Sequence, residues 1–345
     1  MVNLSQTEIL PLHSPQAFAA AVERAAALLQ AGEVVAVPTE TVYGLAANAL
    51  DPRAVAAIYA VKGRPARNPI IVHVASETMA RACVADWPAS AAALAHSFWP
   101  GPLTLVLPKA PHIPDVVTAG GPTVGVRWPR HPFMQALIQR CGFPLAAPSA
   151  NLSNRVSPTT AAHVRHHLEG RIPLIVDGGP CPVGIESTVV ALAGPSFRVL
   201  RPGIIHEASL AAVLGVESAP AAGPEDAQAP LASPGRLPRH YAPRAQVLIW
   251  KWADETDLRA RLAQLNARPE QTYVLAHACV PQQAGWLEVS VAPHDAEAYA
   301  RALYAELHRA DARHARWLAV EQPPEDAPWQ AIHDRLRRAA QQEKT

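Results

Sequence analysis

Several features that would point to a familiar class of protein are scarce in this chain of 345 residues. It has only 4 cysteines, and no two of them form a C-x-x-C pair. Neither a zinc site nor a disulfide framework is therefore indicated. Free cysteines are commonly small core residues, so we expect buried, unreactive thiols at Cys83, Cys141, Cys181 and Cys279.

An excess of charge and long apolar runs are also lacking. With 30 basic and 29 acidic residues the formal net charge is +1, which argues against a strongly basic nucleic-acid-binding domain but leaves room for a local basic cleft. No apolar run reaches the roughly 20 residues that cross a bilayer, so no membrane association is expected. The first residues have neither the basic segment nor the apolar core of a signal peptide, which makes the cytoplasm the expected location.

Two nucleotide-binding signatures are absent from the sequence. Without G-x-x-x-x-G-K-[ST], any bound nucleotide is not held by a P-loop, and without G-x-G-x-x-G dinucleotide binding is not indicated. No Ser/His/Asp order or acidic pair supports a covalent hydrolase. His163 and His167 have the spacing of helical metal ligands, but no third ligand lies nearby in the sequence. A solvated helix face is favoured there, and no residue is assigned to a metal.

The length favours two domains. Residues 218–244 are rich in proline and poor in apolar residues, which is typical of a linker. We therefore predict an N-terminal domain over 1–217, a linker over 218–244 and a C-terminal domain over 245–345.

Strands and short helices alternate irregularly in the N-terminal part, which predicts a mixed, twisted α/β sheet with flanking helices. Ser14 and Pro15 predict a helix start, and Gly32 its end. A second helix is predicted from 52 to about 59, and Ser157 is expected to cap a helix that ends at 168. The other predicted helices cover 76–82, 90–98 and 132–140, and the predicted strands cover 34–37, 70–74, 103–107, 123–127, 144–147, 174–177, 187–192 and 197–200.

The C-terminal part alternates strands and helices more regularly. This order predicts a smaller, Rossmann-like α/β domain. The strands are expected over 247–250, 273–276, 287–291 and 317–320, and the helices over 257–267, 295–313 and 329–340.

The most informative stretch of the N-terminal domain is P-T-E-T-V-Y-G-L at 38–45, which follows the apolar run at 34–37. Such a run feeding a proline and two threonines predicts a buried strand that ends in an ordered turn. The stretch is followed by K-G-R-P at 62–65, N-P at 68–69 and an apolar run that ends in His73. Hydroxyls followed by two cations and an amide are the groups needed to hold an anionic substrate.

Four cations lie at or just beyond the ends of predicted elements: Lys62, Arg64, Arg127 and Arg201. Arginine suits bidentate contact with phosphate or carboxylate, and lysine supplies a point charge, so this placement favours a convergent anion site. Hydroxyls and an amide lie at further strand ends, in S-A-N at 149–151, at Ser157 and in S-T at 187–188.

In order and spacing, these motifs resemble the YrdC-type threonylcarbamoyl-adenylate synthases. The matching motifs are P-T-E-T-V-Y-G-L, K-G-R-P-x-x-N-P-x-I-V-H-V, S-A-N, S-P-T, S-T-V-V and R-P-G, and S-P-G-x-x-x-R-H-Y-A-P in the linker is similar to the long, two-domain form. The resemblance implies synthesis of L-threonylcarbamoyl-AMP from L-threonine, bicarbonate and ATP with Mg²⁺, releasing pyrophosphate. It also implies a partner complex that transfers the group to the adenosine beside the tRNA anticodon, and it leaves open direct contact with tRNA.

Carried over position by position, the resemblance implies roles for individual residues. The threonine side would hold Thr41, His73, Arg127 and Ser187. The ATP side would hold Arg64, Asn68, Thr123, Ser149, Asn151, Ser157 and Arg201, with His240 or Tyr241 reaching back from the linker. The linker's length and prolines further suggest a lid over ATP, in which replacing His240 and Tyr241 is expected to leave thermal stability nearly unchanged. Lys62 and Arg64 would be the catalytic cations. Where the family usually has Ser-Gly after S-A-N, this chain has Ser153 and Asn154, and asparagine tolerates the left-handed backbone that glycine would adopt.

Two other interpretations of the function remain open. One is a non-catalytic RNA-binding module of the same fold, although such a module has no need of the threonine-side residues. The other is a carbamoyl transferase of the hydrogenase-maturation type, although those proteins carry an acylphosphatase region and zinc-finger cysteines that this sequence lacks.

Overall fold

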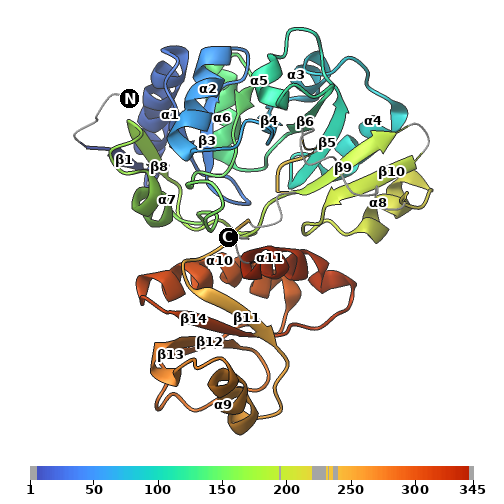
Figure 1. Ribbon diagram of the computed structural model, residues 1–345. Helices are drawn as coiled ribbons and strands as arrows, with labels where there is room; N and C mark the ends of the chain where they lie inside the picture. The colour runs from blue at the N-terminus through green and yellow to red at the C-terminus, as the bar shows by residue number, and fades with distance from the viewer. Residues whose placement is uncertain (1–5, 194–195, 220–230, 232, 236–239, 342–345) are drawn as a thin grey trace. The chain divides into compact units, whose positions relative to one another are not determined.

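The structure is a computed structural model, and it describes residues 6–193, 196–219, 231, 233–235 and 240–341. It divides into two compact units (Figure 1). The first consists of Met1–Ser153 and Ser157–Arg236, and the second of Asn154–Val156 and Leu237–Thr345. Most of the predicted linker lies outside the described residues, so its extent stays a prediction.

A mixed sheet of ten strands forms the first unit, in the order β1-β8-β2-β3-β7-β4-β6-β5-β9-β10. The sheet contains both parallel pairs, such as β2 with β8, and antiparallel pairs, such as β2 with β3, so the predicted mixed α/β fold is confirmed. The strands are β1 Glu8–Pro11, β2 Val35–Val37, β3 Gly44–Asn48, β4 Val72–His73, β5 Leu103–Pro108, β6 Thr123–Arg127, β7 Leu145–Ala146, β8 Leu174–Asp177, β9 Thr188–Ala193 and β10 Ser196–Arg201.

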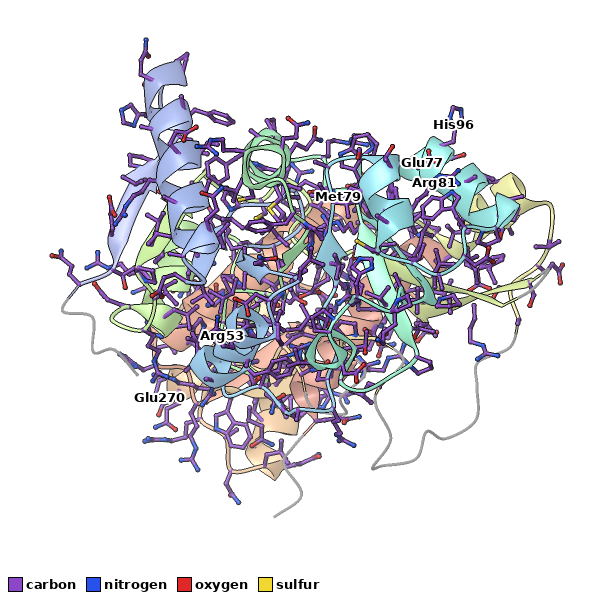
Figure 2. All side chains as sticks on the ribbon, turned by 90° about the horizontal axis from the view of Figure 1, so that it is seen from above. Arg53, Glu77, Met79, Arg81, His96 and Glu270 are labelled. Atoms are coloured by element: carbon purple, nitrogen blue, oxygen red, sulfur yellow. The ribbon has the colours of Figure 1, made fainter. Side chains whose placement is uncertain are left out.

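Helices cover both faces of this sheet (Figure 1). They are α1 Pro15–Gln30, α2 Pro52–Lys62, α3 Glu77–Ala82, α4 Ala89–Phe98, α5 Asp115–Thr118, α6 Pro132–Cys141, α7 Ala161–Leu168 and α8 Glu207–Leu214. Side chains alternate along a strand, so β2 supplies Val35 and Val37 to a core with α1 and α6, and Ala36 to the core on the other face. On α3, Met79 packs against both cores, while Glu77 and Arg81 form an exposed 2.7 Å ion pair one helical turn apart (Figure 2).

Two sequence predictions about helix ends are wrong. Helix α2 continues past 59 to Lys62, because Gly63 is the residue that adopts the left-handed conformation, at φ 59°, and closes the helix. Ser157 does not cap α7. Thr160 has the extended backbone of an N-cap, and its hydroxyl accepts a hydrogen bond from the His163 N–H at 3.3 Å.

Some strands also differ from the predictions. The strand expected over 70–74 is reduced to β4, while β1 and β3 were not predicted at all. By contrast, Ser14 caps α1 as expected, with its hydroxyl accepting from the Ala17 N–H at 3.1 Å. Asn154 has φ 65°, the left-handed conformation expected for the residue that replaces a glycine.

The second unit has a four-stranded, all-parallel sheet in the order β11-β14-β12-β13. Its strands are β11 Gln246–Trp250, β12 Thr272–Ala276, β13 Glu288–Val291 and β14 Trp317–Glu321, and its α-helices are α9 Glu255–Gln264, α10 Ala296–Ala312 and α11 Gln330–Ala340. The predicted Rossmann-like alternation is therefore present, with strand ends within a residue of the prediction.

Cys83, Cys141 and Cys181 are buried, as expected. Cys279 is only half-buried, because it lies in the loop that follows β12, where its thiol donates to the Ala253 carbonyl at 2.9 Å. None of the helices in the described part of the chain combines the length and apolar character needed to span a bilayer.

Candidate active site

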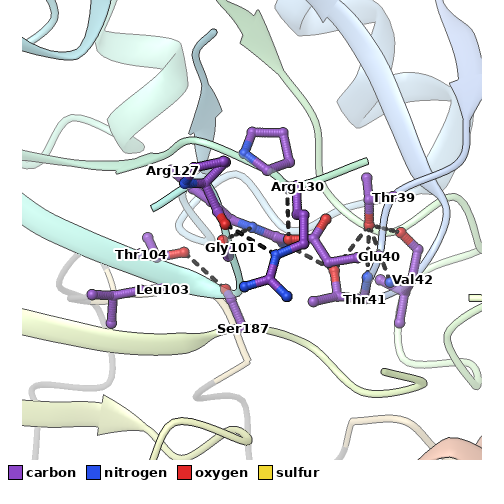
Figure 3. Close-up of polar contacts among 12 residues, drawn as sticks. Thr39, Glu40, Thr41, Val42, Gly101, Leu103, Thr104, Arg127, Arg130 and Ser187 are labelled. Atoms are coloured by element: carbon purple, nitrogen blue, oxygen red, sulfur yellow. Dashed lines mark hydrogen bonds and ion pairs between the residues drawn. The ribbon is translucent and has the colours of Figure 1, made fainter. Parts of the chain in front are cut away.

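The loop between β2 and β3 is held in shape by Thr39. Its hydroxyl donates to the Val42 carbonyl at 2.6 Å and accepts from the Thr41 N–H at 3.2 Å. It also lies 2.9 Å from the Thr41 hydroxyl (Figure 3). This threonine turn fixes the direction in which Glu40 and Thr41 leave the chain.

Arg127, at the end of β6, joins the two side chains that Thr39 orients (Figure 3). Its Nη1 donates to the Thr41 hydroxyl at 2.9 Å, and its Nη2 lies 2.7 Å from Oε1 of Glu40. The side chains of Arg127 and Glu40 are 5% and 6% exposed. Burial by itself would raise the pKa of Glu40, but the charge of Arg127 and the N–H of Arg130 outweigh it, so the pKa is lowered. The result is a buried, ionised pair.

His73 lies beside this pair, because β4 and β6 run parallel with His73 in register with Arg127. Burial, together with the charge of Arg127, lowers the pKa of His73 to about 3, so the imidazole is neutral near pH 7. Its Nδ1 is buried and makes no hydrogen bond with the residues that the structure describes. A neutral ring with an unsatisfied nitrogen can bind a polar ligand.

Ser187, just before β9, connects this group to Arg201 at the end of β10. The Ser187 hydroxyl lies 2.8 Å from the Thr104 hydroxyl and accepts from Arg201 Nη2 at 3.1 Å. Arg201 Nε donates to the Ser187 carbonyl, also at 3.1 Å. A residue expected near threonine and one expected near ATP are therefore in direct contact.

Ser157 is fully buried, and its hydroxyl donates to Oε1 of Glu186 at 2.6 Å. Glu186 immediately precedes Ser187 in the chain, so this bond holds Ser157 close to the start of β9.

Lys62, the last residue of α2, is 2% exposed. Its ammonium donates to the carbonyls of Ser149 and Asn151, and its Nζ lies 3.4 Å from Oδ1 of Asn151. Burial, followed by the charge of Arg64, lowers the pKa of Lys62. The three surrounding oxygens nevertheless match the three N–H donors of a protonated lysine. The bonds join the K-x-R and S-x-N motifs.

Arg64 follows the left-handed Gly63 and holds the loop at 65–69. Its Nε donates to the Asn68 carbonyl at 2.9 Å and its Nη2 to the Pro69 carbonyl at 2.6 Å. Oδ1 of Asn68 is buried and accepts no hydrogen bond from the described residues.

Thr123 lies at the other end of β6 from Arg127. It lines a small pocket together with Thr104, Gly125 and two linker residues, Ser233 and Pro234. Ser233 is 1% exposed, and the N–H of the nearby Leu231 donates to the Arg67 carbonyl at 3.1 Å. This part of the linker packs against the first unit.

His240 and Tyr241 belong to the second unit. Tyr241 is 1% exposed. Its ring centroid lies 5.8 Å from the ring centroid of Tyr304 and 5.3 Å from the guanidinium carbon of Arg335. The His240 ring meets the Tyr241 ring edge-on at 4.0 Å. Tyr241 is thus a core residue of its unit, contrary to the expectation that it adds little to stability. Arg236 and Arg239, which neighbour them in the linker motif, lie outside the described residues.

The structure places three unassigned residues among those expected in the site: Glu40, Thr104 and Glu186. Glu40 and Glu186 had a detectable signal, since Glu40 is the carboxylate within P-T-E-T-V-Y-G-L and Glu186 directly precedes S-T-V-V. Thr104 had no such signal in the sequence, because a threonine within an apolar run is typical of an ordinary strand.

The chain was also compared with known proteins. The family described as "Telomere recombination", which covers Sua5, YciO and YrdC, matches residues 27–203. The family described as "Threonylcarbamoyl-AMP synthase, C-terminal domain" matches residues 205–341.

Relatives named threonylcarbamoyl-AMP synthase cover most of the chain. The Bacillus subtilis protein is 46% identical over 72% of this chain and 70% of its own length, and the Schizosaccharomyces pombe protein is 37% identical over 94% and 90%. The solved structure of Pyrococcus abyssi Sua5 complexed with L-threonine superposes with a TM-score of 0.86 at 35% identity, covering 97% of this chain and 98% of that one. The resemblance inferred from the motifs is confirmed, and the chain belongs to the Sua5/YciO/YrdC family, in the form that carries the threonylcarbamoyl-AMP synthase C-terminal domain.

Proposed function

We propose that this protein synthesises L-threonylcarbamoyl-AMP from L-threonine, bicarbonate and ATP and releases pyrophosphate. The observation that carries the proposal is the buried polar group formed by Thr41, His73 and Arg127, in which a neutral imidazole and a guanidinium face one small region. It is supported by relatives named for this activity and by a relative solved with L-threonine.

On the threonine side, Arg127 pairs with the substrate carboxylate, since a guanidinium is suited to bind a carboxylate. Thr41, His73 and Ser187 supply hydroxyl and imidazole contacts to the remaining polar groups. The pairing of Arg127 with Thr41 and Glu40 holds the guanidinium in place before threonine arrives.

On the ATP side, Lys62 and Arg64 are the cations closest to the phosphates. The other residues assigned to ATP are Asn68, Thr123, Ser149, Asn151, Ser157 and Arg201. Their hydroxyls, amides and positive charges are the groups that a triphosphate and a nucleoside need.

In the reaction, the threonine amine attacks carbon dioxide derived from bicarbonate and loses a proton to give a carbamate. A carbamate oxygen then attacks the α-phosphorus of ATP, and pyrophosphate leaves. Negative charge accumulates on the phosphoryl oxygens and the leaving group, so preorganised cations such as Lys62 and Arg64 lower the barrier by electrostatic stabilisation and positioning.

We propose that Mg²⁺ enters with ATP, because this ion usually keeps several waters and binds through substrate phosphates. Within the described residues, no group of three His, Cys, Asp or Glu side chains is arranged to hold a metal. When bound, Mg²⁺ would neutralise charge on the phosphates, while the orientation of ATP would rest on Lys62, Arg64 and Arg201.

We also propose that residues 218–244 form a lid and linker between a catalytic domain over 1–217 and a C-terminal domain over 245–345. The placement of Ser233 and Pro234 beside Thr123 supports this for the middle of the segment. A contribution of His240 and Tyr241 to ATP binding remains part of the proposal.

The product is an activated carbamoyl group, so a downstream threonylcarbamoyl transferase complex must pass it to the adenosine of tRNA. We place this step in the cytoplasm, where tRNA and ATP are found together, and direct contact of this chain with tRNA belongs to the same proposal.

The test is pyrophosphate release by the purified protein with ATP, Mg²⁺, bicarbonate and L-threonine, without tRNA. Release should require threonine and bicarbonate. Release that does not depend on threonine would overturn the assignment, and tight RNA binding without any release would favour the non-catalytic RNA-binding module.

A further inference from the structure

The two carboxylate oxygens of Glu40 have different surroundings. Oε1 lies 2.7 Å from Arg127 Nη2 and accepts from the Arg130 N–H at 3.1 Å (Figure 3). Oε2 is buried and accepts no hydrogen bond from the residues that the structure describes. Buried polar atoms nearly always have a partner, and leaving a charged one unsatisfied is costly. An unsatisfied carboxylate oxygen at this place therefore calls for a donor from a ligand.

The proposed substrate brings a positively charged donor, its ammonium group, and none of the residues assigned to the threonine side is a carboxylate. Arg127 is a donor and suits the threonine carboxylate, whereas the threonine amine needs an acceptor. Among the buried carboxylates of the first unit, Glu186 already accepts from the Ser157 hydroxyl at 2.6 Å. Oε2 of Glu40, adjacent in sequence to Thr41, is the unsatisfied carboxylate oxygen among the described residues of the group. His73 Nδ1 is also without a partner, but the neutral ring carries no charge to match an ammonium, whereas the carboxylate does.

We infer that Oε2 of Glu40 accepts a hydrogen bond from the amine nitrogen of bound threonine. Glu40 and Arg127 would then recognise the two ends of an amino acid, the amine and the carboxylate. The inference rests on the proposed function and adds a positioning residue to it.

One N–H bond persists through the whole reaction. The threonine ammonium has three, the free amine two, and the carbamate and the finished adenylate one each. Glu40 can therefore hold the same nitrogen from substrate to product and direct its lone pair towards carbon dioxide. The pKa of Glu40 lies below its ordinary value, so the carboxylate orients the nitrogen, and the proton that the amine loses goes to solvent.

The test compares two ligands on two proteins. L-Threonine and (R)-3-hydroxybutanoate share the carboxylate and the side-chain hydroxyl, but the second lacks the amine. Their affinities are measured by calorimetry, without ATP, for the wild-type chain and for Glu40→Gln. Wild type should prefer threonine, and the preference should fall roughly ten- to a hundredfold in Glu40→Gln, the range for a charge-assisted hydrogen bond.

If Glu40→Gln weakens both ligands by the same factor, Glu40 acts only by holding Arg127, and the inference is wrong. Glu186→Gln is the matched control, since it also removes a buried carboxylate charge and should leave the preference for threonine unchanged. A loss of the preference in this control would equally contradict a specific role for Glu40.

Circular dichroism and a thermal melt first establish that each variant is folded. Should Glu40→Gln not fold, the wild-type comparison still decides, because equal affinity for the two ligands would overturn the inference. Threonine-dependent pyrophosphate release by wild type tests the proposed function separately, so the two can fail independently.

Discussion

Arg201 and Ser187 are joined by two hydrogen bonds, from Nη2 to the hydroxyl and from Nε to the carbonyl, each of 3.1 Å. In the proposed function, Ser187 contacts threonine and Arg201 contacts ATP. The bonds place the two substrate sides next to each other, as required when a carbamate formed on threonine must reach the α-phosphorus.

Ser187→Ala should impair the use of both substrates. The substitution removes the hydroxyl that accepts from Arg201 Nη2 and contacts Thr104, while the carbonyl that accepts from Arg201 Nε stays. A lost buried hydrogen bond of this kind costs about 1–3 kcal/mol. Steady-state kinetics with each substrate varied in turn should show higher KM values for threonine and for ATP. Thr104→Val is the control: it breaks one hydrogen bond of Ser187 but keeps the bonds to Arg201, so its effect on ATP should be smaller. A defect of Ser187→Ala confined to one substrate would contradict this coupling.

Arg127→Ala should weaken mainly threonine binding, and Arg64→Ala mainly the use of ATP. Removing a charge-assisted pair from a partly dry site costs about 2–4 kcal/mol, which corresponds to roughly thirty- to several hundredfold in kcat/KM. Arg127→Ala should also lower stability, because it leaves Glu40 buried without its partner. Arg81→Ala, which removes an exposed ion pair and the contact of the guanidinium with the Trp87 ring, should change the use of neither substrate. Equal effects of both variants on both substrates would refute this division.

His73 should make the free energy of unfolding depend on pH. Burial, together with the charge of Arg127, lowers its pKa from 6.5 to about 3 in the folded protein. Between these values the unfolded chain binds the additional proton, so the contribution of His73 is fully present above about pH 6.5 and is lost as the pH falls towards 3. Urea titrations of wild type and His73→Gln across this range should show a shallower decline for the variant. Identical slopes would mean that His73 is protonated in the folded protein.

Tyr241→Ala should lower the melting temperature, although sequence alone places this residue in a linker. The ring is 1% exposed and packs near Tyr304 and the guanidinium of Arg335. Truncating a buried aromatic residue costs about 3–5 kcal/mol. Differential scanning calorimetry of Tyr241→Ala against Tyr241→Phe, which keeps the ring, gives the comparison. An unchanged melting temperature in Tyr241→Ala would mean that this packing contributes nothing.

The sequence predicted best where local chemistry decides the structure. Ser14 and Pro15 mark the start of α1, and the apolar runs give β6 and β8 with their observed bounds, because capping and alternation act over a few residues. The sequence did not predict β3, since Gly44–Asn48 consists mainly of glycine and alanine, and these residues favour strands only weakly.

The sequence predicted which residues belong to the site, but not which of them contact one another. The motifs named Arg127, Thr41, Ser187 and Arg201, yet their hydrogen bonds link residues far apart in the chain, and such pairs depend on the order of strands in the sheet. For the same reason the pairing of Glu40 with Arg127 could not be inferred from the motif that contains Glu40.

The most direct measurement of the central claim is the fate of isotopically labelled bicarbonate. The purified chain is incubated with labelled bicarbonate, L-threonine and Mg-ATP, and the products are separated and identified by mass spectrometry. We predict that the label appears in an AMP adduct that also contains threonine, in amounts matching the pyrophosphate released. Pyrophosphate released together with an adduct that lacks the label, or that lacks threonine, would contradict the account.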